Sequence, residues 1–228
     1  MNYWPLFLSV LIRRFYRQLS KSKNLFKSDF NNSNIIISYF RFSKNRYKTI
    51  LMDINFFRKI RVLDGGMGQE LLARGLAPRG TLWSAKALLE KKNHSLVEAI
   101  HEDFVKVGAD VIVTNTFATR RLRLKQNNLE EKFEMLNKQA GQIAKKIKDK
   151  YPKILIAGGL PPQNNTYSSD ERDENEIFDN FKDQAKILNP FVDFFYFDVL
   201  SSIREISIAE NSIKEFNKPF LIGAHISE

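Results

Sequence analysis

The chain has 228 residues, of which 43% are hydrophobic and 27% charged, the composition of an ordinary globular protein. It contains no cysteine, which excludes disulfides and thiolate metal sites within these residues, and its three histidines lack the paired spacing of a histidine zinc site. The formal net charge of +10 is concentrated in residues 1–51, which hold ten Lys/Arg and one acid, whereas the remainder is nearly neutral. We therefore expect no specific nucleic-acid site in the body of the protein.

Residues 1–51 form a compositionally distinct segment. An apolar run at residues 6–12 precedes a cluster of arginines, which is the reverse of a secretory signal, and the run is too short to span a membrane. We expect a basic N-terminal extension outside the fold, a body over residues 52–228 and a location in the cytoplasm. An organelle transit peptide, or a basic arm that binds RNA or an anionic membrane, would also suit this composition.

From residue 52 onward, short apolar runs alternate with amphipathic segments. Polar residues without periodicity at 163–175 indicate a surface loop. Helical spacing predicts helices at residues 67–74, 84–90, 95–107, 129–150, 176–188 and 203–216. The apolar runs predict strands at residues 61–63, 110–114, 153–157, 192–197 and 219–222.

This alternation predicts an α/β fold with a parallel sheet and crossover helices. A doubly wound sheet and a (β/α)8 barrel both fit the pattern, and no GxGxxG turn supports a dinucleotide-binding fold. Polar groups or glycines follow the first four predicted strands, at Asp64, Asn115, Gly158–Gly159 and Asp198. In either architecture these positions gather at one face of the sheet, where ligand sites form.

The stretch RVLDGGMGQE at residues 61–70 has the layout of a strand, an acid, a glycine turn and a helix. Gly65 and Gly66 allow the backbone to approach a ligand, and a helix that begins at Met67 directs free N–H groups to the same place. Asp64 and Asp198 could hold an ammonium group between them, because carboxylates supply charge-assisted acceptors. Together these features describe a site for a zwitterion such as an amino acid.

One histidine and most of the large aromatic side chains are expected to have structural roles. His101 lies beside acids on an amphipathic helix and is expected at the surface or in helix packing. Trp83 and the 19 phenylalanines are expected in the core.

Five segments of the chain form a recognisable series: LDGGMGQELLARG (63–75), WSAKALLE (83–90), IHEDFVKVGADVIVTNTF (100–117), IAGGLPP (156–162) and VDFFYFDVLSSIREI (192–206). In this order they resemble the homocysteine S-methyltransferase family. The resemblance implies a (β/α)8 TIM barrel with homocysteine at its C-terminal face and a zinc ion, held by three cysteines, that activates the sulfur. It assigns the homocysteine amino group to Asp64 and Asp198, backbone contacts to Gly65, Gly66 and Met67, and the pocket floor to Thr114 and Asn115.

Two departures from the family pattern limit what this chain is expected to do. The acid at the fourth strand is usually glutamate, and Asp198 is one methylene shorter. The family's zinc cysteines follow the sixth strand and the eighth, and this sequence has none of them. We therefore expect a (β/α)8 barrel truncated after about five βα units, with no catalytic and no metal-binding residue of its own and with apolar, unpaired outer strands.

The leading hypothesis is a homocysteine S-methyltransferase-like protein that transfers a methyl group to the homocysteine thiol to make methionine. Its expected partners are homocysteine, a methyl donor and possibly a complementary C-terminal chain that carries the zinc ligands. An alternative is a non-catalytic binding or assembly module derived from that barrel. A third hypothesis is a metal-free barrel enzyme that uses Asp64 and Asp198 as acid and base.

Overall fold

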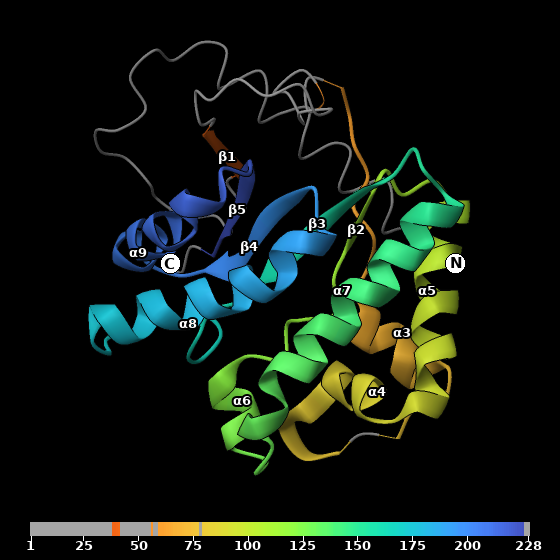
Figure 1. Ribbon diagram of the computed structural model, residues 1–228, viewed down its shortest axis with the longest axis horizontal. Coiled ribbons are helices and arrows are strands. Elements are labelled where there is room, and N and C mark those ends of the chain that lie inside the picture. The colour runs from red at the N-terminus through yellow and green to blue at the C-terminus, as the bar shows by residue number, and fades with distance from the viewer. Residues whose placement is uncertain (1–37, 42–55, 57–58, 78, 226–228) are drawn as a thin grey trace. The chain divides into compact units, whose positions relative to one another are not determined.

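The computed structural model describes residues 38–41, 56, 59–77 and 79–225 (Figure 1). Within these residues a five-stranded sheet has the order β1-β5-β4-β3-β2. Strands β2 to β5 are parallel, and β1 runs antiparallel to β5. The strands are β1 (Ser38–Arg41), β2 (Val111–Val113), β3 (Leu155–Leu160), β4 (Phe194–Leu200) and β5 (Phe220–Ala224).

Helices follow the parallel strands β2, β3 and β4, as the sequence pattern predicted, so the mixed α/β class with a parallel sheet is confirmed. The longest helices, α7 and α8, pass across the sheet in Figure 1 and contact β3. No helix in the described part of the chain is both long and apolar enough to cross a bilayer. The helices are α3 (Met67–Ala73), α4 (Lys86–Leu89), α5 (His94–Lys106), α6 (Arg121–Lys125), α7 (Phe133–Lys150), α8 (Glu174–Leu188) and α9 (Ile203–Ile213).

Short 3-10 turns extend or join several of these helices. The turn η1 includes residues that the sequence pattern assigned to a helix at 84–90, and η5 continues the predicted helix at 203–216. The turns are η1 (Gly80–Ala85), η2 (Lys91–Asn93), η3 (Glu130–Lys132), η4 (Asn189–Phe191) and η5 (Lys214–Phe216).

The predicted strand at residues 61–63 is present only as a short parallel pairing beside β2. Leu63 forms a single bridge with Val111. The carbonyl of Val62 accepts hydrogen bonds from the N–H groups of Asp110 and Val111 at 2.8 and 3.2 Å, and the N–H of Asp64 donates to the carbonyl of Val111 at 2.9 Å. This pairing fixes the backbone of Asp64 beside β2.

Other element boundaries also differ from the predictions. Strand β3 contains Gly158 and Gly159, and β4 contains Asp198, so these residues lie inside strands that were expected to end before them. The short helix α6 was not predicted. Strand β1 precedes the predicted start of the body at residue 52 and pairs with β5, whose outer edge was expected to be open. The division at residue 51 itself stays a prediction.

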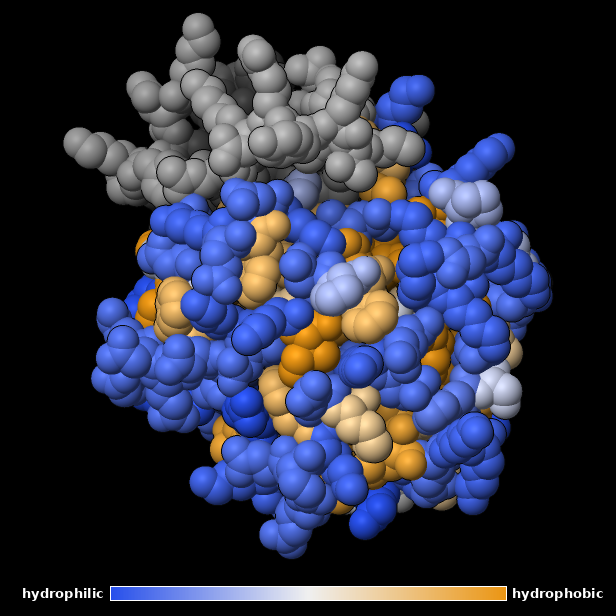
Figure 2. Space-filling model, viewed as in Figure 1, coloured by the Kyte–Doolittle hydropathy of each residue, from blue (hydrophilic) through white to orange (hydrophobic). Residues whose placement is uncertain are grey.

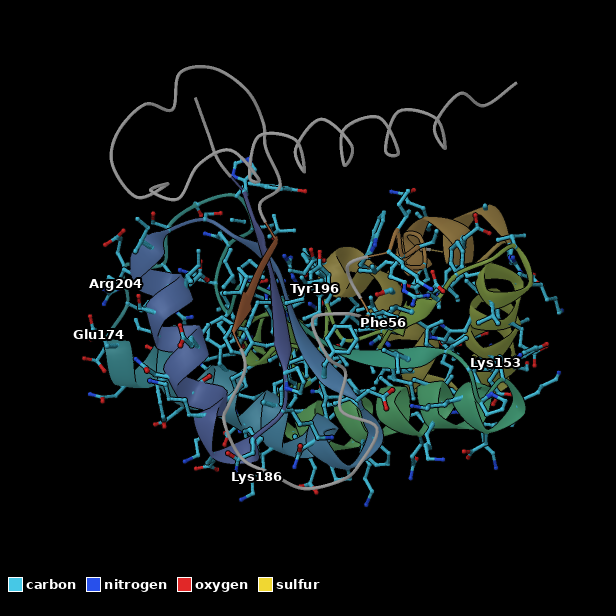
Figure 3. All side chains as sticks on the ribbon, turned by 90° about the horizontal axis from the view of Figure 1, so that it is seen from above. Phe56, Lys153, Glu174, Lys186, Tyr196 and Arg204 are labelled. Atoms are coloured by element: carbon cyan, nitrogen blue, oxygen red, sulfur yellow. The ribbon has the colours of Figure 1, made fainter. Side chains whose placement is uncertain are left out.

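Apolar side chains cover both faces of the sheet, as expected for parallel strands. Because side chains alternate along a strand, Phe195 and Phe197 of β4 pack with helices α7, α8 and α9, whereas Phe194 and Tyr196 lie on the opposite face with Val111 and its neighbours. Figure 3 shows Tyr196 among the strands. On the face seen in Figure 2, hydrophilic residues predominate over the helices, with smaller apolar areas between them.

A buried asparagine joins α7 to the loop that follows β2. The side-chain oxygen of Asn137 accepts from Thr119 Oγ1 at 2.7 Å and from Gln184 Nε2 at 3.0 Å. Its nitrogen donates to the carbonyls of Thr119 and Phe133 at 3.2 and 2.9 Å. The amide is fully satisfied by four partners, which fixes the loop against α7 and α8.

Replacing Asn137 with alanine should therefore lower the free energy of unfolding by about 2–4 kcal/mol, because buried groups of Thr119 and Gln184 lose their partner. Urea denaturation followed by circular dichroism measures this change. Asn211→Ala is the matched control, since Asn211 is an exposed residue of α9, and should change the free energy by less than about 0.5 kcal/mol. Equal losses in the two variants would contradict the role assigned to Asn137.

Candidate functional site

Asp64 is a buried carboxylate anchored to β2. Only 3% of its side chain is exposed, and both oxygens accept the backbone N–H of Val113 at 3.1 Å. Its Oδ2 also lies 3.4 Å from Nδ1 of His101. Burial raises the pKa of Asp64, and this effect outweighs the opposing influence of His101 and the Val113 N–H. The carboxylate is therefore fixed in position, but its partners do not offset the unfavourable burial of its charge.

His101 was expected at the surface or in helix packing, and the surface interpretation is wrong. Its side chain is fully buried on α5, and neither ring nitrogen has a hydrogen bond that meets standard geometry among the described residues. Its position in the apolar stripe with Val97 and Phe104, at spacings of four and three, was the signal in the sequence that it faces inward. The imidazole of His101 on α5 lies beside the carboxylate of Asp64.

The glycine turn after Asp64 leads into α3. Gly65 and Gly66 are exposed, whereas Met67 is buried in the core. A Cβ atom at Gly68 would lie 1.9 Å from Nε1 of Trp83, so the indole covers this part of the first turn of α3. Trp83 was expected in the core, but it is 42% exposed and has a φ of 47° within the η1 turn. The core prediction for Trp83 is wrong because this left-handed turn directs the indole across α3 instead of inward.

The residues after β2 form a polar turn that is tied to β3. Thr116 Oγ1 donates to the carbonyl of Gly159 at 2.6 Å, and the N–H of Gly159 donates to Thr114 Oγ1 at 2.9 Å. The side-chain nitrogen of Asn115 donates to the carbonyl of Ser84 at 3.1 Å. All three polar side chains are buried. Their hydrogen bonds connect β2, β3 and the η1 turn, and the predicted role of Thr114 and Asn115 as a pocket floor stays a prediction.

Asp198 lies in β4 at an irregularity of the strand. The register between β4 and β5 shifts between Phe197 and Leu200, and Val199 has a φ of 63°, a rare conformation for a β-branched residue. The hydroxyl of Tyr196 donates to Asp198 Oδ1 at 2.9 Å. Burial raises the pKa of Asp198 above its ordinary value, and the hydrogen bond from Tyr196 lowers it only in part.

Tyr196 links the two acids. Burial raises the pKa of its phenol, and the negative charges of Asp198 and of Asp64 both raise it further. The phenol therefore contacts the carboxylate of Asp198 directly, whereas the charge of Asp64, beside β2, acts on the pKa of the phenol at longer range. The sequence analysis did not single out Tyr196, although its position two residues before Asp198 placed both side chains on one face of the strand.

The carboxylates of Asp64 and Asp198, the first buried and the second half-buried, thus both have raised pKa values. Among the described residues, no group of three or more His, Cys, Asp or Glu side chains could hold a metal ion.

Comparison with known proteins identifies the family. The sequence profile of the family described as "Homocysteine S-methyltransferase" matches residues 61–228. The chain belongs to the homocysteine S-methyltransferase family. The resemblance carried by the DGGMG and GADVIVTNTF segments is thereby confirmed.

Individual relatives agree with this membership. The chain is 28% identical over 178 residues to the S-methylmethionine–homocysteine S-methyltransferase BHMT2 of Rattus norvegicus, covering 78% of this chain and 46% of that protein. It is 32% identical over 111 residues to the homocysteine S-methyltransferase of Escherichia coli, covering 45% of this chain and 35% of that protein. The chain spans about half the length or less of the curated relatives it matches first.

A solved structure supports the fold. The metallated form of the homocysteine methyltransferase MmuM from Escherichia coli superposes with a TM-score of 0.63 and 22% sequence identity, covering 72% of this chain and 62% of that chain. The likeness is in the arrangement of strands and helices.

The charge on Asp198 generates a prediction about stability. Because the pKa of this carboxyl is raised above the ordinary 3.8, the folded protein holds the proton more tightly than the unfolded chain does, and stability falls as the pH rises through this window. Asp198→Asn keeps an acceptor for the Tyr196 hydroxyl without the charge. It should increase the free energy of unfolding at neutral pH, and the gain should vanish below pH 3.8.

Urea denaturation at several pH values measures this effect. Asp149→Asn is the matched control, because the side chain of Asp149 is 61% exposed on α7, and it should change the free energy of unfolding by less than about 0.5 kcal/mol. A loss of stability in Asp198→Asn at neutral pH would show that the buried charge is compensated in the free protein.

Proposed function

We propose that this chain is the homocysteine-binding part of a homocysteine S-methyltransferase, an enzyme that transfers a methyl group from a donor to the homocysteine thiol and yields methionine. Family membership supplies the reaction class. The observation that carries the proposal is that Asp64 is a buried carboxylate beside β2 and Asp198 a half-buried one beside Tyr196, and that the pKa values of both carboxyls are raised. Homocysteine carries an ammonium group that would compensate both charges.

In this proposal the amino acid is held at its backbone end. Its ammonium lies between Asp64 and Asp198, and its carboxylate meets the exposed backbone of Gly65 and Gly66, ahead of the buried Met67. The thiol is then directed away from the two acids. The chain thereby positions the nucleophile, which is one requirement for attack on a methyl group in line.

The residues present do not fit the zinc ion of the family. The sequence contains no cysteine, and the described residues offer no cluster of metal ligands. A thiol is a weak nucleophile at neutral pH unless something lowers its pKa. We therefore propose that the group that activates the thiol comes from residues outside these 228, on a further segment or on a complementary chain.

A metal analysis tests whether this chain binds homocysteine without the group that activates the thiol. The purified chain should contain substoichiometric zinc and should show no methylation of homocysteine on its own. A chelator should leave its affinity for homocysteine unchanged, because the proposed contacts involve the ammonium and carboxylate groups. Stoichiometric zinc, together with an affinity that falls on chelation, would contradict the proposal.

Calorimetry with L-homocysteine tests the proposed site itself. The full chain should bind the amino acid, and Asp198→Asn or Asp64→Asn should weaken binding by about 10- to 100-fold, the effect of losing a charged hydrogen-bond partner. Asp149→Asn, which changes an exposed carboxylate, should bind as the unaltered chain does. Equal affinities in all four proteins would contradict the site.

The same titration should depend on pH in a defined direction. Asp64 lies beside His101, Asp198 accepts the Tyr196 hydroxyl, and both charges act on the phenol of Tyr196. An ammonium group is held most strongly when both carboxylates are charged. Because burial raises both pKa values, affinity should fall as the pH decreases, and the loss should begin above the ordinary aspartate pKa of 3.8. An affinity that is constant down to that pH would contradict the proposal.

A second candidate is a non-catalytic binding or assembly module derived from the same barrel. The absence of cysteine favours it, as does the exposure of Ile60 and Val62, which are 54% and 51% exposed beside the Leu63–Val111 pairing. A folded chain that fails to bind homocysteine would support this candidate over the first.

A further inference from the structure

We propose that the phenol oxygen of Tyr196 is a third acceptor for the ammonium group of the bound amino acid, and that Tyr196 thereby selects substrates with a free amino group. The inference rests on the proposed function, since it concerns the same ligand. It assigns a binding and specificity role to a residue that neither the sequence pattern nor the family comparison singled out.

The hydrogen-bond inventory of the phenol is the first support. A tyrosine hydroxyl has one proton to donate and lone pairs that accept. Its proton is directed to Asp198 Oδ1 at 2.9 Å. The oxygen therefore keeps its accepting lone pairs beside Asp198, where an ammonium bound to that carboxylate can reach them.

The position of the phenol is fixed by packing. A Cβ atom built on Gly223 of β5 would lie only 2.9 Å from the Tyr196 hydroxyl oxygen, so the tip of the ring lies against the bare backbone of the next strand. The ring itself packs against the apolar cluster that includes Val111, Ala157 and Leu221. A phenol held in this way offers its oxygen at one place without a further loss of side-chain freedom.

The number of acceptors is the second support. An ammonium has three N–H donors, and a buried donor without a partner costs about 1–3 kcal/mol. Each carboxylate has two oxygens, but both oxygens of Asp64 already accept the Val113 N–H and Oδ1 of Asp198 accepts the Tyr196 hydroxyl, while the cluster around Tyr196 is otherwise apolar. The Tyr196 oxygen adds a further acceptor beside Asp198.

Tyr196→Phe removes the oxygen and keeps the ring. The test compares L-homocysteine with 4-mercaptobutanoate, which lacks only the amino group, by calorimetry on the full chain. Tyr196→Phe should weaken homocysteine binding by about tenfold or more, as expected for a hydrogen bond to a charged group. It should change the affinity for 4-mercaptobutanoate by less than about twofold, because that ligand has no ammonium to lose.

Tyr151→Phe is the matched control, because Tyr151 packs against the helix-side cluster at the end of α7 and touches none of these groups. It should leave both affinities unchanged, and circular dichroism verifies that both variants fold. If Tyr196→Phe weakens both ligands equally, or neither, the role of Tyr196 is overturned while the proposed function stands. If the unaltered chain does not bind homocysteine at all, the proposed function fails and this inference fails with it.

Discussion

Two poorly compensated carboxylates, the buried Asp64 beside β2 and the half-buried Asp198 on β4, are the constraint on which the rest of the site depends. A buried carboxylate is unfavourable unless it is paired or strongly hydrogen-bonded. Asp64 accepts a hydrogen bond from the Val113 N–H and lies beside the His101 imidazole, and Asp198 accepts a hydrogen bond from the Tyr196 hydroxyl. Neither set of partners restores the ordinary pKa, and the proposed ligand carries an ammonium group that would compensate both charges.

The surrounding fold holds this arrangement in place. The Leu63 pairing sets Asp64 beside β2, and the Thr114–Gly159 and Thr116–Gly159 hydrogen bonds lock β2 to β3. On β4, the irregularity at Val199 changes the register next to Asp198. Left-handed backbone at a β-branched residue costs free energy, and such strain occurs most often at functional sites. The packing of the surrounding sheet therefore has to offset the unfavourable backbone conformation of Val199.

The order of strands and helices was predictable because parallel strands buried on both faces produce short apolar runs separated by amphipathic helices. The strand ends were not predictable. Glycine usually indicates a turn, yet Gly159 lies within β3, where a Cβ atom would come within 3.0 Å of Val113 Cγ1 and 3.2 Å of Thr116 Oγ1. Asp198 was expected to follow the fourth strand directly, yet it lies within β4 beside an irregularity.

The sequence predicted the two acids of the proposed site but not the groups that lie beside them. Asp64 and Asp198 could be selected as carboxylates next to apolar runs. The inward orientation of His101 depends on how α5 packs, and the contact between Tyr196 and Asp198 depends on a strand that continues past the predicted end. Long-range packing of this kind leaves only weak periodic signals in a single sequence.

A crystal structure of the full chain with L-homocysteine tests the central claim most directly. The account predicts that the amino nitrogen lies within about 3 Å of a carboxylate oxygen of both Asp64 and Asp198. An amino acid bound with its ammonium in solvent, while both carboxylates keep only their protein partners, would contradict it.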